Sequence, residues 1–274
     1  MHGLSSAATI AAEAHRRVSR DWHPKEVSNC TQLSVVGMEP APPPRPRKGA
    51  VLTDLEALAN VVETVAARAG ARIVGFTSAM RAEGVSTCAA AVSFLLAARG
   101  HVPTIRRQTG SPLEPGQQGH AGLVVLVDAH LGDPFLHDAF ALPISPGLRD
   151  WLPAGQSLTS VAHRVKGTQL LVVPAGKGLG SAGVDLPRLA TALQELAQQV
   201  RLVVVDLPPI LRAPEGVRFA MVCDAVVLVV RAHHTRWEAV LQAQRVLDRA
   251  GVPILGAVLN RRRFELPRWL YERL

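Results

Sequence analysis

Short apolar runs rich in valine and leucine alternate along the chain with longer stretches of helical spacing. The runs occupy residues 72–77, 123–127, 170–173, 202–205, 225–230 and 254–259, and the clearest helical stretches occupy residues 52–68, 85–99, 185–199 and 235–250. A strand without polar alternation has to be covered on both faces, and helices between such strands supply the cover. We therefore predict an α/β fold, with a mostly parallel β-sheet flanked by helices on both faces.

The chain divides into three segments. Its 274 residues suffice for one large domain with a full core, and the regular pattern places that domain at residues 51–262. Residues 1–50 are an N-terminal extension, in which five prolines between Pro40 and Pro46 predict a stiff linker. Residues 106–121 are rich in Gly, Pro and Gln, which favours a surface insertion, and residues 263–274 form a basic, aromatic C-terminal tail.

The sequence favours a cytoplasmic protein. The longest nearly apolar stretch, residues 89–98, is about half the roughly twenty residues that span a bilayer. Charged residues interrupt the first thirty positions, where an export signal would need an apolar core. The cysteines, Cys30, Cys88 and Cys223, are scattered and form no disulfide framework, which fits a reducing compartment.

A polar turn after the first apolar run leads directly into a helix. Gly84 and the hydroxyl pair Ser86 and Thr87 have the layout of a phosphate-binding loop, where backbone N–H groups and a helix N-terminus receive anionic oxygens. The full pattern is G-x-x-x-x-G-K-[ST], and Val85 stands in the place of its lysine. On this loop alone, a phosphate site and an ordinary strand-to-helix corner are both open.

Two later apolar runs end in an aspartate, Asp128 and Asp206. In a parallel sheet the carboxyl ends of the strands meet at one edge, so both carboxylates are expected beside the loop. Carboxylates in that place can hold Mg²⁺ or its waters, and Ser86, Asp128 and Asp206 are therefore the candidate metal ligands. The alternative for each aspartate is a helix cap or a turn cap.

The order of these motifs resembles the bacterial tyrosine kinases (BY-kinases) and the cytoplasmic ATPase-like domains of capsular and exopolysaccharide co-polymerases, which share a deviant Walker A loop. The family loop reads approximately T-S-x-x-P-G-E-G-K-S-T, and the chain matches it at Thr77, Ser78, Glu83, Gly84, Ser86 and Thr87. Residues 125–137 match the Walker A′ motif and residues 204–209 match Walker B. The resemblance covers about residues 70–262 and implies a P-loop NTPase-like sheet.

The resemblance also implies a ligand and partners. The ligand would be ATP or ADP with Mg²⁺, held by Ser78, Arg81, Glu83, Gly84, Val85, Ser86, Thr87, Asp128 and Asp206. The partners would be a membrane polysaccharide co-polymerase or synthase subunit and further copies of the chain, which would place the protein peripherally at the inner membrane.

Several positions depart from the family pattern. Replacing the lysine by Val85 removes a charge-assisted contact to phosphate, typically worth about 1.5–3 kcal/mol. Ala82 replaces a loop glycine, which puts close backbone approach in doubt, and His130 replaces the second acid of Walker A′. Arg81 replaces the usual proline and is the candidate substitute cation, although its fork geometry differs from that of an ammonium group.

The features that serve phosphorylation in the family are missing as well. BY-kinases phosphorylate a tyrosine-rich tail, and this chain has one tyrosine, Tyr271. Their oligomerising helix carries a Glu and two Arg at three-residue spacing, whereas here Glu56 is followed by Ala59 and Val62. Ring assembly with phosphorylation between neighbours is therefore poorly supported.

Three hypotheses follow for the function. The first is a catalytically degenerate BY-kinase-like protein, a pseudokinase that serves exopolysaccharide synthesis and export as a scaffold or regulator. The second is an active ATPase or tyrosine kinase that uses a substitute cation. The third is a partition-type, ATPase-like positioning protein that binds membrane or DNA. The formal charge is +8, from 30 basic and 22 acidic residues, and the basic, aromatic residues 261–274 suit a membrane surface. We do not expect nucleic acid as a partner.

Overall fold

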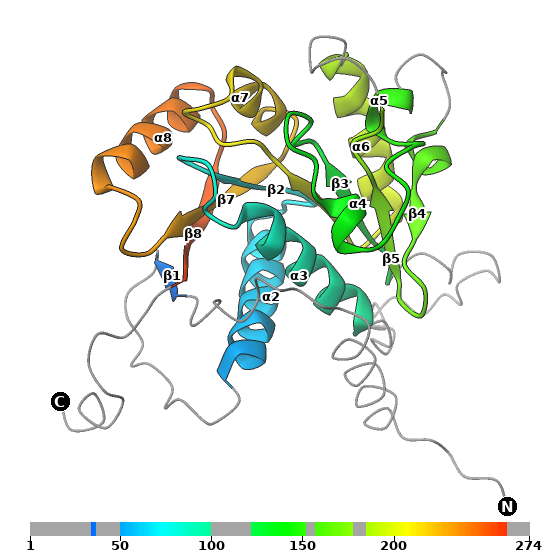
Figure 1. The fold of residues 1–274 in the computed structure, drawn as a ribbon, viewed down its shortest axis with the longest axis horizontal. Coiled ribbons are helices and arrows are strands. Elements are labelled where there is room, and N and C mark those ends of the chain that lie inside the picture. The colour runs from blue at the N-terminus through cyan, green and yellow to red at the C-terminus, as the bar shows by residue number, and fades with distance from the viewer. Residues whose placement is uncertain (1–33, 37–49, 100–121, 152–156, 178–184, 262–274) are drawn as a thin grey trace, which may run out of the picture.

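The fold is built on one mixed β-sheet. The computed structural model describes residues 34–36, 50–99, 122–151, 157–177 and 185–261. The strands are β1 Ser34–Val36, β2 Ile73–Ser78, β3 Val124–Asp128, β4 His163–Arg164, β5 Leu170–Val173, β6 Leu202–Asp206, β7 Ala225–Arg231 and β8 Ile254–Asn260. Their order across the sheet is β1-β8-β7-β2-β6-β3-β5-β4, as Figure 1 shows. Neighbours from β8 to β5 pair in parallel, and β1 and β4 pair antiparallel at the two edges.

The predicted parallel α/β fold is confirmed. All the strands predicted from apolar runs are present, with ends displaced by at most a residue. The described helices are α2 Ala50–Ala69, α3 Val85–Ala98, α4 Leu136–Ala139, α5 Leu148–Trp151, the 3₁₀ turn η2 Leu158–Val161, α6 Leu186–Gln199, α7 Pro214–Ala220 and α8 Trp237–Arg249. The two edge strands and the short helices were not predicted, because segments of two to seven residues carry too little periodicity to read.

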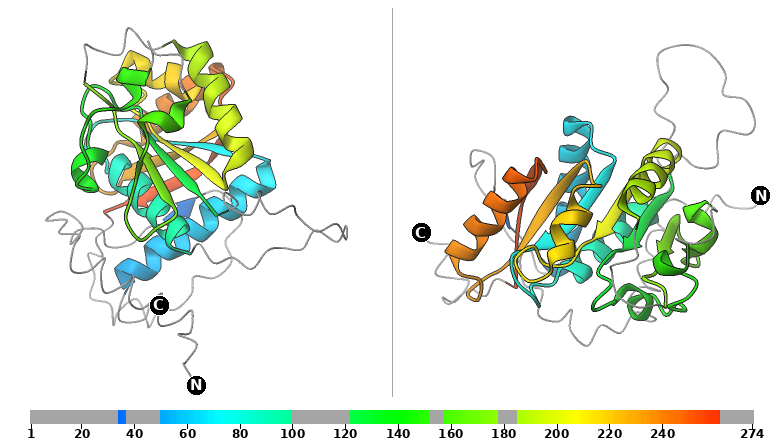
Figure 2. Two further views of the ribbon diagram at one scale, coloured as in Figure 1. Left: turned by 90° about the vertical axis from the view of Figure 1, so that its right-hand side faces the viewer. Right: turned by 90° about the horizontal axis from the view of Figure 1, so that it is seen from above.

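Two hydrophobic cores lie on opposite faces of the sheet. One face packs against α2 and α3, where Leu58, Val62 and Leu96 are buried with Phe76 of β2. The other face packs against α6, α7 and α8 and holds, among others, Leu193. Figure 1 shows α2 and α3 on one side of the sheet with α6, α7 and α8 on the other, and Figure 2 gives two further views of this layering. The strands β2, β3 and β6 are buried along their whole length because both faces of the sheet are covered there.

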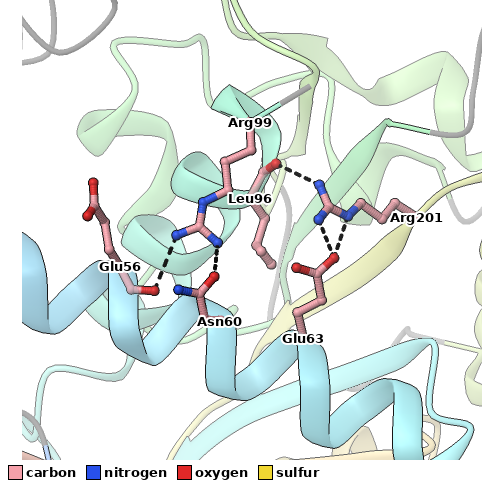
Figure 3. Close-up of polar contacts among 6 residues, drawn as sticks. All are labelled: Glu56, Asn60, Glu63, Leu96, Arg99 and Arg201. Carbon is pink, nitrogen blue, oxygen red and sulfur yellow. Dashed lines mark hydrogen bonds and ion pairs between the residues drawn. The ribbon is translucent and has the colours of Figure 1, made fainter. Parts of the chain in front are cut away.

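Polar contacts fasten α2 to the rest of the domain (Figure 3). Arg201, which precedes β6, donates from Nε to Glu63 Oε1 of α2 at 2.6 Å and from a terminal nitrogen to Leu96 O of α3 at 3.1 Å. Arg99 at the end of α3 donates to the side chain of Asn60 and to the backbone carbonyl of Glu56. These contacts join α2 to the far end of α3 and to the start of β6.

Parts of the predicted organisation lie outside the described residues. These are the 106–121 insertion, the 263–274 tail and most of the 1–50 extension. Within that extension, Ser34–Val36 form β1, so three of its residues belong to the sheet. Among the described helices, none has both the length and the apolar character that crossing a membrane requires.

Candidate functional site

The turn between β2 and α3 lies at the carboxyl edge of the sheet and contains two left-handed residues. Ala82 has φ 60° and Gly84 has φ 88°. An L-residue with a side chain pays roughly 1–2 kcal/mol for this conformation, so Ala82 keeps the backbone shape of a glycine position at a cost in stability. Ala82 also adds a methyl group to the loop, so the doubt about close backbone approach of a ligand stays a prediction.

Glu83 is turned into the protein. Its side chain is buried, Thr235 Oγ1 donates to its Oε1 at 2.6 Å, and its Oε2 has no hydrogen-bond partner among the described residues. Burial raises the pKa of Glu83, and the hydrogen bond from Thr235 and the charge of Arg231 oppose that rise. The prediction that Glu83 contacts a nucleotide is not supported by this placement. Glu83 instead ties the loop to the segment that follows β7.

Asn260, the last residue of β8, also forms a hydrogen bond with this loop. Its amide nitrogen donates to the backbone carbonyl of Glu83 at 2.8 Å, and the side chain is fully buried. A Cβ atom placed on Gly84 would overlap this amide nitrogen, and φ at Gly84 is positive. Position 84 is therefore restricted to glycine on two independent grounds.

The remaining loop residues predicted to bind nucleotide differ in their placement. Val85 is 9% exposed and belongs to the core cluster that contains residues of α2 and α3, so the native side chain brings no charge to the loop. Ser86 and Thr87 are half-buried on the first turn of α3. The Ser78 hydroxyl donates to Met80 O at 2.7 Å, which uses it within the turn itself.

Asp128 and Asp206 lie side by side, as the parallel sheet predicts. They are register partners at the ends of β3 and β6, and both are completely buried. Asp128 accepts hydrogen bonds from the backbone N–H groups of His130 and Leu136, each at 3.2 Å. Neither carboxylate oxygen of Asp206 has a hydrogen-bond partner among the described residues.

The acid pair is electrostatically uncompensated. Burial raises the pKa of Asp206 well above its ordinary value, the charge of Asp128 raises it further, and the nearby Ser86 hydroxyl opposes both effects. Burial also raises the pKa of Asp128 from 3.8 to about 7, against the backbone hydrogen bonds and the charge of Arg149. A buried carboxylate without a partner is costly unless a cation or a proton neutralises it. The acid pair and Ser86 therefore fit a hard divalent cation such as Mg²⁺.

Arg81 and His130 occupy the open side of this edge. The pKa of His130 is lowered, first by burial and also by the charge of Arg81, while Asp133 and Glu215 act in the opposite direction. Arg81 itself is exposed. An arginine on the loop thus lies within electrostatic reach of the Walker A′ segment, where the family pattern has a second acid.

Sequence reasoning missed three residues of this edge. Asn260 and Thr235 support the loop, and Arg149 lies near Asp128 while donating to Leu131 O at 2.7 Å. Asn260 could have been predicted as a residue of this edge, because it is a polar residue at the end of an apolar run. The same pattern identified Asp128 and Asp206. Thr235 and Arg149 lie in loops or short helices and carry no such signal.

A left-handed turn after a central strand, a buried helix that begins at the turn, and an acid pair on the next two strands define the P-loop NTPase class. Comparison with solved structures agrees. The kinase domain of Escherichia coli tyrosine kinase ETK superposes with a TM-score of 0.63 and 20% identity, covering 80% of each chain. The septum site-determining protein MinD of Pyrococcus horikoshii, complexed with Mg-ADP, gives 0.52 and 19% over 68% of each chain.

Comparison with known sequences identifies a more specific group of similar proteins. No family model matches the chain. Tyrosine-protein kinase ptk of Acinetobacter johnsonii is 26% identical over 139 residues, which are 50% of this chain and 19% of ptk. Tyrosine-protein kinase YwqD of Bacillus subtilis is 28% identical over 191 residues, 68% of this chain and 71% of YwqD. The chain is similar in sequence to these bacterial tyrosine kinases, and the matched region spans about a fifth of the length of ptk.

Proposed function

We propose that this protein is a catalytically degenerate homologue of the bacterial tyrosine kinases that serves exopolysaccharide or capsule synthesis as a scaffold or regulator. The observation that carries the proposal is Val85. A P-loop lysine places its ammonium group on the transferred phosphate, where the negative charge is greatest. A buried valine that packs between α2 and α3 cannot perform that step.

The rest of the edge keeps features that suit a phosphate ligand. Gly84 adopts the left-handed conformation, α3 begins directly after it, and Ser86 lies on the first turn of that helix. Asp128 and Asp206 would hold Mg²⁺, which would neutralise the phosphate charge of a bound ATP or ADP. We therefore propose that nucleotide binds weakly and serves to set the conformation of the loop rather than to donate phosphate.

The helix that carries the oligomerisation motif in the family supports a role outside a kinase ring. Ala59 and Val62, which stand where the motif has its arginines, are 0% and 4% exposed and pack into the core. Glu56 alone is exposed. We propose that the protein docks to a membrane polysaccharide co-polymerase or synthase subunit at the inner membrane, in place of assembling with copies of itself.

A titration with ATP and ADP, with and without Mg²⁺, tests the nucleotide part of the proposal. Wild-type protein is expected to bind weakly and to hydrolyse no ATP. Val85→Lys is expected to raise the affinity about 10- to 100-fold, from about 1.5–3 kcal/mol of restored charge contact. Val85→Met is the matched control, because it has the length of lysine without the charge. Mg²⁺-dependent ATP hydrolysis or tyrosine labelling by wild-type protein at the rate of an intact kinase would refute the proposal.

A second candidate, an active ATPase with a substitute cation, is favoured by Arg81. Its guanidinium is exposed on the loop and influences His130 across the site. This hypothesis predicts measurable turnover that Arg81→Gln, Asp128→Ala and Asp206→Ala each abolish. Turnover that survives all three substitutions would exclude it.

A further inference from the structure

The end of β7 and the end of β8 lie side by side at the carboxyl edge of the sheet, and the segment after β7 continues from there. Arg231 and Asn260 are register partners, and Ala232 N donates to Asn260 O at 2.8 Å. The chain then turns through residues 232–236 into α8, while β8 leads into Arg261. We call the side chains of Arg231, Arg236, Trp237 and Arg261 the β7–α8 surface.

This surface is basic and carries an exposed tryptophan. Trp237 is 67% exposed, the most exposed of the large apolar side chains in the described part of the chain. Arg236 is exposed, and Arg231 and Arg261 are partly exposed. Residues 231–238 contain a single acid, Glu238, against two arginines. The surface therefore combines positive charge with an aromatic ring that is available for burial against a partner.

The start of α8 departs from what helix stability favours. Arg236 is the N-cap residue of α8 and makes no side-chain capping bond, although the helix N-terminus is its positive end. The chain caps α6 in the ordinary way, with Asp185 accepting from Arg188 N at 3.2 Å. Glu238 in the first turn complements the helix dipole, but Arg236 adds no capping bond. Trp237 buries only a third of its surface, and residues that contribute little to the fold are expected at binding surfaces.

We propose that the β7–α8 surface docks on an anionic lipid bilayer. Arginine is attracted to anionic headgroups, and tryptophan favours the boundary between headgroups and acyl chains, where its ring is buried and its N–H stays hydrated. A nucleic-acid duplex would use the arginines on its phosphates, whereas the tryptophan ring would have no unstacked base to contact. This inference concerns a surface separate from the acid pair, and it holds whether or not nucleotide binds.

The sequence beyond the described residues is consistent with a bilayer partner. The chain leaves β8 at Arg261, and residues 262–274 contain four arginines, two glutamates and three aromatic residues. The proposal rests on the described surface, and the variants below leave residues 262–274 unchanged, so that any contribution of the tail is the same in every measurement.

Co-sedimentation of the full chain with vesicles tests the proposal. Wild-type protein is expected to bind vesicles of phosphatidylcholine with phosphatidylglycerol, to bind pure phosphatidylcholine vesicles weakly, and to dissociate as salt is raised. Each arginine near an anionic surface contributes roughly a fivefold increase in partitioning, so Arg236→Glu should lower binding by about 25-fold. Trp237→Ala should lower binding roughly fivefold or more, because the ring no longer enters the interface.

Matched controls lie at the opposite edge of the sheet. Arg249→Glu makes the same charge change at the other end of α8, and Met221→Ala removes a side chain that is 61% exposed before β7. Both controls should bind vesicles about as wild-type does. Equal losses in the controls, or wild-type binding in Arg236→Glu and Trp237→Ala, would overturn the proposal. So would binding of the full chain to double-stranded DNA through Arg236 without binding to anionic vesicles.

Discussion

Replacing Asp206 by asparagine should make the protein more stable at neutral pH. Both oxygens of this carboxylate are buried without a hydrogen-bond partner among the described residues, and Asp128 lies next to it in register. Burial and the charge of Asp128 raise the pKa of Asp206 well above its ordinary value. A neutral amide of the same shape removes the charge that the site does not compensate.

The sign and size of the effect follow from proton linkage. An acid whose pKa is higher in the folded state binds its proton more tightly there, so stability falls as pH rises from the unfolded pKa to the folded pKa. For Asp128 this window runs from 3.8 to about 7. At about 1.4 kcal/mol per pKa unit, the shift at Asp128 corresponds to about 4 kcal/mol before relaxation of the site is counted. We expect Asp206→Asn to gain about 1–3 kcal/mol at pH 7.5, since relaxation of the site and the unpartnered amide reduce the gain.

Urea denaturation of both proteins between pH 4 and pH 8 measures the difference. The stabilising difference should grow as pH rises above 3.8, the ordinary pKa of the group, and should shrink toward pH 4, where the unfolded chain also begins to bind the proton. Asp133→Asn, an exposed site on the loop after β3, is the control and should show no such trend. A difference that is independent of pH, or a variant less stable than wild-type at pH 7.5, would refute the electrostatic account of the acid pair.

Four further substitutions test the attachment of α2 and the backbone of the loop between β2 and α3. Glu63→Ala should lower the free energy of unfolding by about 1–2 kcal/mol in a urea titration, because Arg201 loses a partly buried carboxylate partner. Glu56→Ala is the control. It should cost less than about 0.5 kcal/mol, because Arg99 contacts the backbone carbonyl of residue 56 and not the exposed side chain. Ala82→Gly should stabilise by up to about 1 kcal/mol by removing left-handed strain, read as a higher thermal midpoint. Gly84→Ala should cost about 2 kcal/mol or more, and a smaller loss would contradict the contact with Asn260.

The sequence determined the architecture well because its strands are apolar throughout. Residues 202–205 contain no polar residue, which predicts a strand buried on both faces, and β6 forms there with both faces buried. The adjacency of Asp128 and Asp206 was predicted for the same reason, since parallel strands bring their carboxyl ends to one edge. These two features needed only the local pattern and the rule for parallel sheets.

The orientation of individual loop side chains was not predictable in this way. Glu83 matches the family loop, yet its carboxylate is directed to Thr235, which lies 152 positions later in the chain. Val85 was read as a missing charge, and the structure adds that the valine is part of the core. Both outcomes depend on contacts between distant segments, which neither periodicity nor a motif specifies.

The two short edge strands restrict how copies of this protein can associate. Parallel sheets with open edges can grow by adding strands from a second molecule, which leads to aggregates. Here β1 covers the outer edge of β8 with three antiparallel pairs, and β4 covers β5 with two, ending the sheet in His163 and Arg164. Strands of only three and two residues offer a second molecule little length for pairing, which disfavours self-association by sheet extension. Removal of Ser34–Val36 would uncover β8 from Ala257 to Leu259, and a truncated chain should be more prone to aggregate.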